Sequence, residues 1–288
     1  PDEHGMKDGD SIIFINKLNT LDHLLILTNH GNMIYRPVHE ITELKWKDVG
    51  EHISQTITNL SMSEEIIAAF PYKEIDANKL FIFMSKEGMI KQTRMTEFSP
   101  WRTYRSRPTT AMKLKNDTDE IVSVFLTNET RNVDVFIASH RAFGLRYPLE
   151  EVPVVGSKAA GVKAINLKDG DYVVAGALVP SDGDSPILLL SQRGAAKRML
   201  AQELPQLGRA KCGLMIFREL KKNPHRLAYM TAETEGKLTL TTTKGIEKEI
   251  EISKVAISDR ISNGTFAIDE KQEGELFSVM QLQELDEE

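Results

Sequence analysis

The sequence predicts an all-β fold of propeller-like units, and three observations support this prediction. A hairpin-shaped unit recurs five times within the 288 residues. Each copy carries a tight turn at the same position. No segment longer than about ten residues shows the apolar period of a helix. Because a four-stranded unit at a period of about 50 residues is typical of a propeller blade, we expect a radial arrangement of five blades.

The repeated unit begins with an apolar strand that leads into Thr or Ser and continues, after the turn, into a strand with basic or aromatic residues. Both strands are rich in Ile, Leu, Val, Phe and Thr, which suit a half-buried pleated surface. The copies align without a gap and span residues 26–41, 83–98, 137–152, 189–204 and 240–255. Five gapless copies disfavour the alternative of a β-sandwich with accidental internal similarity. The signatures of WD and kelch propellers are absent.

The turn of each copy has a glycine at its centre, except in the third copy. A tight hairpin needs a positive φ, which glycine adopts without steric cost. The five turn positions are Gly31, Gly88, Ala142, Gly194 and Gly245, with successive spacings of 57, 54, 52 and 51 residues. Since alanine adopts a positive φ less readily, we expect the third turn to shift toward Gly144.

A looser segment and a further strand follow each hairpin. The clearest example spans residues 156–178, and fainter versions span 109–126 and 264–282. Each repeat therefore supplies about four strands. Since one such unit cannot bury its apolar face alone, neighbouring units are expected to stack into a ring or an arc.

Charge is unevenly distributed along the chain, whose formal net charge is −6. Residues 86–115 contain eight Lys or Arg and two Glu, and residues 191–226 contain nine Lys or Arg and two Glu. Residues 269–288 contain eight acids and one Lys. Because the field near a surface depends on where the charges lie, this segregation is compatible with a basic nucleic-acid-binding face on an acidic protein.

Several function classes are disfavoured by what the sequence lacks. The apolar stretches are far shorter than the roughly 20 residues of a membrane span, and no signal segment opens the chain. The one cysteine, Cys212, excludes a disulfide or thiolate cluster within the chain; we interpret it as a small buried residue of a cytoplasmic protein. No metal-binding, nucleotide-binding or nucleophile motif occurs, so we expect no cofactor, no metal and no catalytic residue.

The domain organisation that we expect is simple. Residues 1–9 are polar and are interpreted as a linker or an edge of the domain. Residues 10–282 form one repeat domain. Residues 283–288 form an acidic tail, which is charge-rich and therefore expected to be disordered.

Three segments show a resemblance to a known family. They are TNHGNMIYRPVHEI at 28–41, SHRAFGLRYPLEEVPVVGSKAAGVKAINLKDGD at 139–171 and SQRGAAKRMLAQELPQLGRAKCGL at 191–214. They resemble the C-terminal repeats of the A subunits of bacterial type IIA topoisomerases, gyrase and topoisomerase IV. The segments 218–226 and 45–57 favour the topoisomerase IV branch of the Gram-positive type.

The resemblance implies a fold, a function and partners. The fold is a β-pinwheel, a propeller-like ring in which neighbouring blades exchange strands. Members often have six blades, so five hairpins leave open either an earlier repeat or an open ring. The implied function is sequence-independent binding and bending of duplex DNA, which helps the parent enzyme to select DNA crossings for strand passage. The implied partners are the breakage-reunion domain of the same subunit, together with a ParE-like ATPase subunit; the catalytic tyrosine lies outside this chain.

Gyrase is distinguished within the family by a glycine-rich basic box, Gln-(Arg/Gln)-Arg-Gly-Gly-(Arg/Lys)-Gly. The nearest segment here, residues 192–198, lacks the second glycine and falls on the fourth hairpin itself. We therefore interpret it as an ordinary hairpin, which argues against gyrase-type wrapping of DNA.

The candidate DNA contacts are basic and aromatic residues that recur after the turns or cluster in loops. A curved row of Lys and Arg binds the regular phosphates of a duplex without reading its bases. The hairpin candidates are Tyr35, Arg36, Lys91, Arg94, Arg146, Lys197 and Arg198, with Tyr147 beside Arg146. The loop candidates are Arg102, Arg105, Arg107, Arg209 and Lys211. The fifth hairpin carries Glu247, Lys248 and Glu249 instead, which predicts a gap in the row.

The main alternative is a propeller-type protein-interaction module that does not bind DNA. Its basic rim would then contact an acidic protein partner. A gyrase-type wrapping domain is the other alternative.

Overall fold

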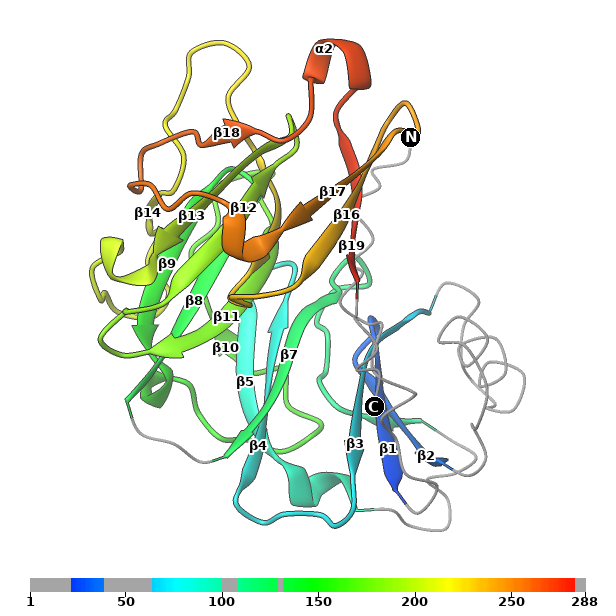
Figure 1. Cartoon of the computed structure of the whole chain (residues 1–288). Helices are drawn as coiled ribbons and strands as arrows, with labels where there is room; N and C mark the ends of the chain where they lie inside the picture. Colours follow the sequence, from blue (N-terminus) through cyan, green and yellow to red (C-terminus); the bar gives the residue numbers. More distant parts are fainter. Residues whose placement is uncertain (1–21, 39–63, 100–107, 129–131, 283–288) are drawn as a thin grey trace.

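The computed structural model of the chain describes residues 22–38, 64–99, 108–128 and 132–282. Five antiparallel β-sheets follow one another along the chain in a curved arrangement, from the blue sheet at the lower right of Figure 1 through cyan and green to the orange sheet at the upper right. Helix is confined, among these residues, to the one-turn α2 (Glu270–Glu273) and short 3-10 turns. The all-β, propeller-like prediction is confirmed.

Each sheet is built around one of the five predicted hairpins. The hairpins are β1 (His23–Thr28) with β2 (Asn32–Pro37), β4 (Lys79–Ser85) with β5 (Met89–Arg94), β8 (Val133–Ser139) with β9 (Phe143–Pro148), β12 (Pro186–Ser191) with β13 (Ala195–Leu200), and β16 (Lys237–Thr242) with β17 (Glu247–Glu251). A third strand joins the first strand of each hairpin on its other edge. These strands are β3 (Ile66–Tyr72), β7 (Ile121–Asn128), β11 (Val173–Pro180), β15 (Leu227–Thr231) and β19 (Leu276–Leu282).

A two-residue strand completes each of the first four sheets, and it comes from the next repeat. These strands are β6 (Thr109–Thr110), β10 (Val162–Lys163), β14 (Leu214–Met215) and β18 (Thr265–Phe266). β6 follows the second hairpin but pairs with β2 of the first, and β10, β14 and β18 likewise pair with β5, β9 and β13. This is the strand exchange that the resemblance implies, and it ties each sheet to its successor.

The loops that lead into the last three exchanged strands are called the exchange loops here: residues 153–161, 205–213 and 256–264. Each begins after a 3-10 turn at the end of its hairpin. These 3-10 turns are η6 (Leu149–Glu151), η7 (Ala201–Glu203) and η8 (Ile252–Lys254), and η4 (Met95–Phe98) has the same place after the second hairpin. One residue of each exchange loop forms a parallel bridge to the hairpin of the previous repeat, in the pairs Gln92–Val154, Arg146–Gln206 and Arg198–Ile257.

The turn residues adopt the predicted backbone conformation, including the residue that is not glycine. Gly31 and Gly194 have φ of 81° and 94°, and Ala142 has φ of 70°. The expected shift of the third turn toward Gly144 was therefore wrong. Gly144 lies in β9, where an added Cβ would come 2.7 Å from a methyl group of Ile216, so close packing rather than turn geometry requires glycine there.

The hydrophobic core lies between successive sheets. Alternate residues of one hairpin strand face opposite neighbours: Leu188 and Leu190 pack toward the fifth sheet, whereas Leu189 packs toward the third. β12 is therefore buried on both faces, which explains why its sequence is continuously apolar. β16 has instead the alternating burial of a strand with one covered face.

The fifth sheet has three strands within the described residues, in the order β17-β16-β19. The fifth repeat supplies four strands as expected, but its sheet contains only three of them, because β18 pairs with β13 of the fourth sheet and no strand among the described residues takes the corresponding place beside β17. Cys212 was also misjudged, since it is exposed on an exchange loop. In the part of the chain that the structure describes, no helix is long and apolar enough to cross a membrane.

Candidate nucleic-acid interface and the blade junctions

The predicted site residues fall into two structural classes. Those on the second strands of the hairpins mostly lie under the exchange loop of the next repeat. Those on the exchange loops lie at the surface. The first class can therefore contact only the protein itself, whereas the second can contact a ligand, although both were selected from the sequence for the same reason.

Arg146 shows how a hairpin residue holds the next repeat. Its side chain is buried and makes an ion pair of 2.8 Å with Asp134, which is also buried. The guanidinium also donates to the carbonyl oxygens of Leu204 at 2.8 Å and Ser181 at 3.0 Å. All of these partners are internal, so Arg146 is not placed to meet a phosphate.

The same contact recurs at two other junctions. Gln92 donates to the Val152 carbonyl at 2.9 Å, and Arg198 donates through Nε to the Val255 carbonyl at 2.7 Å. Gln92, Arg146 and Arg198 occupy one position of the repeat, and so do the carbonyls that they contact. Each of these three junctions is thus closed by a donor from one hairpin and the carbonyl of the residue just before the next exchange loop.

Lys91 and Lys197 form a second recurring contact, one residue earlier in the repeat. Lys91 Nζ donates to the carbonyls of Gly156 and Ser157 at 2.9 and 3.0 Å. Lys197 Nζ donates to three carbonyls of residues 259–262 at 2.6–3.2 Å and lies 4.8 Å from the ring centroid of Phe217. Both side chains are buried, and this desolvation lowers the pKa of each to about 8.

The first hairpin has no equivalent cation at the Lys91 position, but Tyr35 and Arg36 are buried as well. The Tyr35 hydroxyl lies 2.6 Å from His23 Nδ1, and Arg36 donates to the Tyr35 carbonyl at 2.7 Å. The placement of these hairpin residues on an accessible rim is therefore corrected for Tyr35, Arg36, Lys91, Arg146 and Lys197. Basic residues recur at one position of the repeat because they hold the junction between blades, and such a junction also recurs with every repeat.

The exposed candidates are fewer. Arg94 is exposed beside Glu97 and the exchange-loop residue Val154, and Arg198 is half-buried. Lys211 is exposed and Arg209 half-buried on the second exchange loop. Arg209 donates to the carbonyls of Glu151 at 3.1 Å and Lys163 at 2.6 Å, which orders the loop. Arg102, Arg105 and Arg107 lie outside the described residues.

Two lysines that the sequence reasoning missed lie next to this loop. Lys158 and Lys163 are exposed on the first exchange loop and its short strand. The two loops touch, since Asn166 N donates to the Lys211 carbonyl at 2.9 Å and Arg209 contacts the Lys163 carbonyl. The signal was present in the sequence, because Lys158 lies in the loop that corresponds to the one with Arg209 and Lys211.

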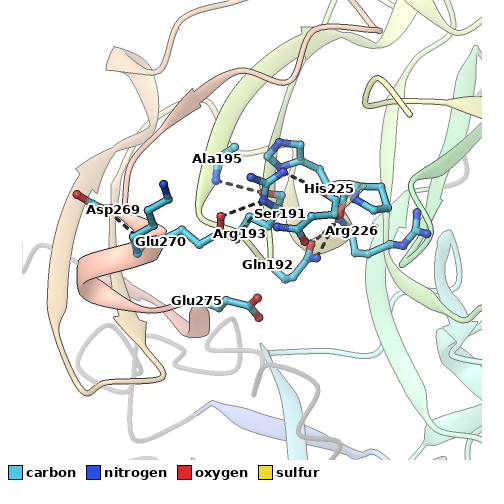
Figure 2. A network of polar contacts seen from close by, with 12 residues as sticks. Ser191, Gln192, Arg193, Ala195, His225, Arg226, Asp269, Glu270 and Glu275 are labelled. Carbon is cyan, nitrogen blue, oxygen red and sulfur yellow. Dashed lines mark hydrogen bonds and ion pairs between the residues drawn. The ribbon is translucent and has the colours of Figure 1, made fainter. Parts of the chain in front are cut away.

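A polar network at the fourth hairpin turn illustrates how the turn side of a junction is closed (Figure 2). The His225 Nδ1 lies 2.8 Å from Ser191 Oγ, and Arg193 makes an ion pair of 3.0 Å with Glu270. Desolvation lowers the pKa of His225, and the Arg193 charge lowers it further. These groups satisfy one another, so the network holds β12, the segment before β15 and α2 together rather than forming an open site. The described residues contain no group of three or more metal-ligating side chains.

Comparison with known families identifies four of the five repeats. The family model described as "DNA gyrase C-terminal domain, beta-propeller" matches residues 22–73, 79–128, 134–180 and 185–231. The fifth hairpin lies outside the matched segments. The Gln192–Arg198 segment lies on the β12–β13 hairpin, as expected.

Curated relatives agree over nearly the whole chain. It is 42% identical over 281 residues to the A subunit of DNA topoisomerase 4 from Bacillus subtilis, covering 97% of this chain and 34% of the relative. It is 40% identical over 300 residues to the corresponding protein of Streptococcus pneumoniae, covering 99% of this chain and 36% of the relative. The chain thus spans about a third of the length of these relatives.

Solved structures give the same result. The crystal structure of the C-terminal domain of DNA topoisomerase IV superposes with a TM-score of 0.81 at 40% identity, over 92% of this chain and 80% of that one. The gyrase A C-terminal domain superposes with a TM-score of 0.68 at 20% identity, over 92% of this chain and 84% of that one. The second comparison supports the fold alone.

Proposed function

We propose that this chain, which belongs to the family of DNA gyrase C-terminal β-propeller domains and within it to the topoisomerase IV type, binds and bends duplex DNA without reading its sequence. The observation that supports this proposal is the group of cations on two adjoining exchange loops, Lys158 and Lys163 on the third repeat and Arg209 and Lys211 on the fourth. Loops at the same place in successive repeats present these cations at a regular spacing. A duplex presents phosphates in the same regular manner.

The contact residues that we propose on the described loops are Lys158, Lys163, Arg209 and Lys211, with Arg94 and Arg198 at their margins. Arg102, Arg105 and Arg107, which lie outside the described residues, are proposed as contacts from the sequence alone. Arginine and lysine bind phosphate oxygens whatever the base sequence, so these contacts position the duplex rather than select a site. The buried hairpin cations support the loops from below by holding their backbone carbonyls.

The bend that we propose is local. Bending a short site by 40–90° costs on the order of 1–6 kcal/mol, and the extra contacts along a curved surface offset it. The row of cations is interrupted at the fifth hairpin, where Glu247 and Glu249 are exposed. A partial arc of contacts stabilises a bent segment but not a complete wrap.

The parent enzyme supplies the rest of the reaction in this proposal. The domain itself is non-catalytic and needs no cofactor. The breakage-reunion domain of the same subunit, together with a ParE-like ATPase subunit, would cut, pass and reseal DNA in the cytoplasm. By holding a bent segment, the domain would help the enzyme to select DNA crossings. Residues 10–282 would form this domain, with 1–9 as the linker.

Salt dependence tests the electrostatic part of the proposal. If about four to six phosphates are neutralised, log K should fall against log salt with a slope of about −4 to −5, and unrelated duplexes of one length should bind alike. Fluorescence anisotropy with labelled duplexes at several salt concentrations measures both. Binding to an acidic protein with no affinity for DNA would favour the interaction-module alternative instead.

Plasmid relaxation by a nicking-closing enzyme tests the bend against gyrase-type wrapping. At concentrations of the domain that saturate the plasmid, we expect little or no change in linking number. A large shift of one sign would show wrapping and would contradict the proposal.

The acidic tail, residues 283–288, is proposed to compete with DNA for the basic loops because of its charge. A chain that ends at Leu282 should then bind DNA more tightly at low salt. Equal affinity of the truncated and full chains would show that the tail has no such role.

A further inference from the structure

The fifth hairpin lacks, among the described residues, the strand that completes the other four. In those four sheets the carbonyl of the turn residue accepts an N–H from the incoming segment. The bonds are Ala111 to Gly31 at 2.7 Å, Ala164 to Gly88 at 2.7 Å, Ile216 to Ala142 at 2.9 Å and Ala267 to Gly194 at 2.8 Å. Within residues 22–38, 64–99, 108–128 and 132–282, no backbone N–H occupies the corresponding place at Gly245.

The space beside the fifth turn is open as well. A Cβ added at Gly194 would come 2.8 Å from Ile268 of the incoming segment, and one at Gly88 would come 3.3 Å from the Ile165 carbonyl oxygen. At Gly245 nothing among the described residues lies within 4 Å. Among the described residues, the hairpin therefore has both the edge and the room for a further strand.

The side chains that hold an incoming segment are altered in the fifth copy. Lys248 occupies the position of Lys91 and Lys197, but it is partly exposed and makes an ion pair of 3.0 Å with Glu273. Glu249 occupies the position of Arg146 and is itself exposed, with Lys237 at 3.7 Å. Where the second, third and fourth hairpins have a donor for a carbonyl (Gln92, Arg146 and Arg198), the fifth has an acid, which favours a basic or N–H-bearing partner.

We propose that the outer edge of β17 is a docking site for an extended, basic segment of a partner protein, which adds to the sheet as its fourth strand. Main-chain hydrogen bonds at an open edge supply the affinity of such strand addition. Lys248 would hold the carbonyls of the segment, and Glu249 would pair with a Lys or Arg of it. The exposed Glu247 on the same strand adds to the preference for a basic segment and disfavours DNA at this edge.

The four exchanged segments of the chain itself indicate which sequences would fit beside β17. Each exchanged strand has two residues, then a small or branched apolar residue, and then a large buried one, as in Val162-Lys163-Ala164-Ile165. Ala164 and Ile165 are buried, so this part of the segment fills the space beside the turn. The residue that bridges to the Glu249 position is Val154 in the second junction, ten residues before Ala164. A basic residue there would meet Glu249.

A peptide made from the chain's own second junction tests the proposal. The probe is a fluorescein-labelled peptide with the sequence of residues 152–167 and the change Val154→Lys. The matched controls are the same peptide with Val154→Glu and a scrambled peptide of the composition of the probe. Because opposed charges on paired strands attract and like charges repel, the chain should bind the Lys peptide about fivefold or more tightly than the Glu peptide.

The variant Glu249→Lys should reverse this preference, and a gain of affinity for the Glu peptide cannot arise from loss of folding. Hydrogen exchange should slow in residues 246–250 when the Lys peptide is bound. The proposal is overturned if the scrambled peptide binds as well as the probe, if no peptide binds up to about 1 mM, or if Glu249→Lys leaves the ranking unchanged. None of these readouts involves DNA, so they are independent of the proposed function.

Discussion

Lys197 and Lys248 occupy the same position in successive copies of the repeat, yet they have opposite environments. Lys197 is 1% exposed beneath the backbone carbonyls of residues 259–262, and its pKa is lowered to about 8 by burial. The Lys248 side chain is 42% exposed and pairs with Glu273. The difference lies in the segment that follows the next hairpin, which covers Lys197 and has no counterpart over Lys248 in the described residues.

The comparison extends to the whole set of basic residues. Lys91, Arg146 and Lys197 hold exchange loops in place, whereas Lys158 and Lys211 stand on the outside of such loops. A basic residue of this protein therefore holds a neighbouring loop if an exchanged segment crosses it, and is available to a ligand at the surface if none does. The following experiments test this division, beginning with the substitution that should change the protein most.

Replacing Arg146 by Ala should destabilise the chain most. The substitution leaves Asp134 buried without its cation, which typically costs about 3–5 kcal/mol. Lys158→Ala is the matched control, because removal of an exposed lysine changes stability by no more than about 0.5 kcal/mol. Urea unfolding followed by circular dichroism measures both. A loss below about 1 kcal/mol for Arg146→Ala would contradict the junction role, since even a single hydrogen bond contributes about 1 kcal/mol net to the free energy of unfolding.

Replacing Lys158, Lys163 and Lys211 together by Ala should weaken DNA binding without affecting stability. If each contacts one phosphate, the salt slope should lose about one unit per lysine, and affinity should fall about tenfold or more at 0.1 M salt. The parallel variant Arg102→Ala, Arg105→Ala and Arg107→Ala should act in the same way. Lys254→Ala, an exposed lysine on the fifth repeat, serves as the control. Unchanged affinity and slope in both triple variants would remove these loops from the interface.

The pH dependence of stability should report two histidines at the turn side of the third and fourth repeats, the half-buried His140 and the buried His225. Burial lowers the pKa of His140 and of His225 in the folded state. The unfolded chain therefore binds more protons near pH 6, so stability is full above about pH 6.5 and decreases as pH falls below it. The measurement is the urea midpoint between pH 7.5 and pH 5. The double variant His140→Gln and His225→Gln should flatten this decrease; an unchanged pH dependence would contradict the assignment.

The smallest effect is expected at the third turn. Ala142→Gly relieves a positive φ worth roughly 1–2 kcal/mol, but it removes a buried methyl group worth about 0.8 kcal/mol and adds chain entropy to the unfolded state. The terms nearly cancel, so the free energy of unfolding should change by less than about 1 kcal/mol. At Gly194 the reverse substitution has no such balance, because its Cβ would meet Ile268 of the exchanged segment. Thermal unfolding of both variants checks the contrast.

The fold could be predicted from the sequence because each repeat carries its own local instructions. The turn glycines, the apolar first strands and the gapless spacing identified all five hairpins. The prediction failed where neighbouring segments decide. Ala142 keeps its turn although alanine resists a positive φ, and Gly144 is required by the approach of Ile216 rather than by the turn.

The all-β repeat, the family and the segregation of charge could all be inferred from the sequence, since periodicity, turn chemistry and composition are local properties. Tertiary structure alone decided which cations reach the surface. Lys91 and Lys197 look like surface lysines in sequence, but an exchange loop from the next repeat crosses each of them. Burial depends on a segment about 65 residues away in the chain. The neighbours of a lysine in the sequence do not reveal the distant segment that buries it. The contacts between the ammonium group and the backbone carbonyls identify that segment in the structure.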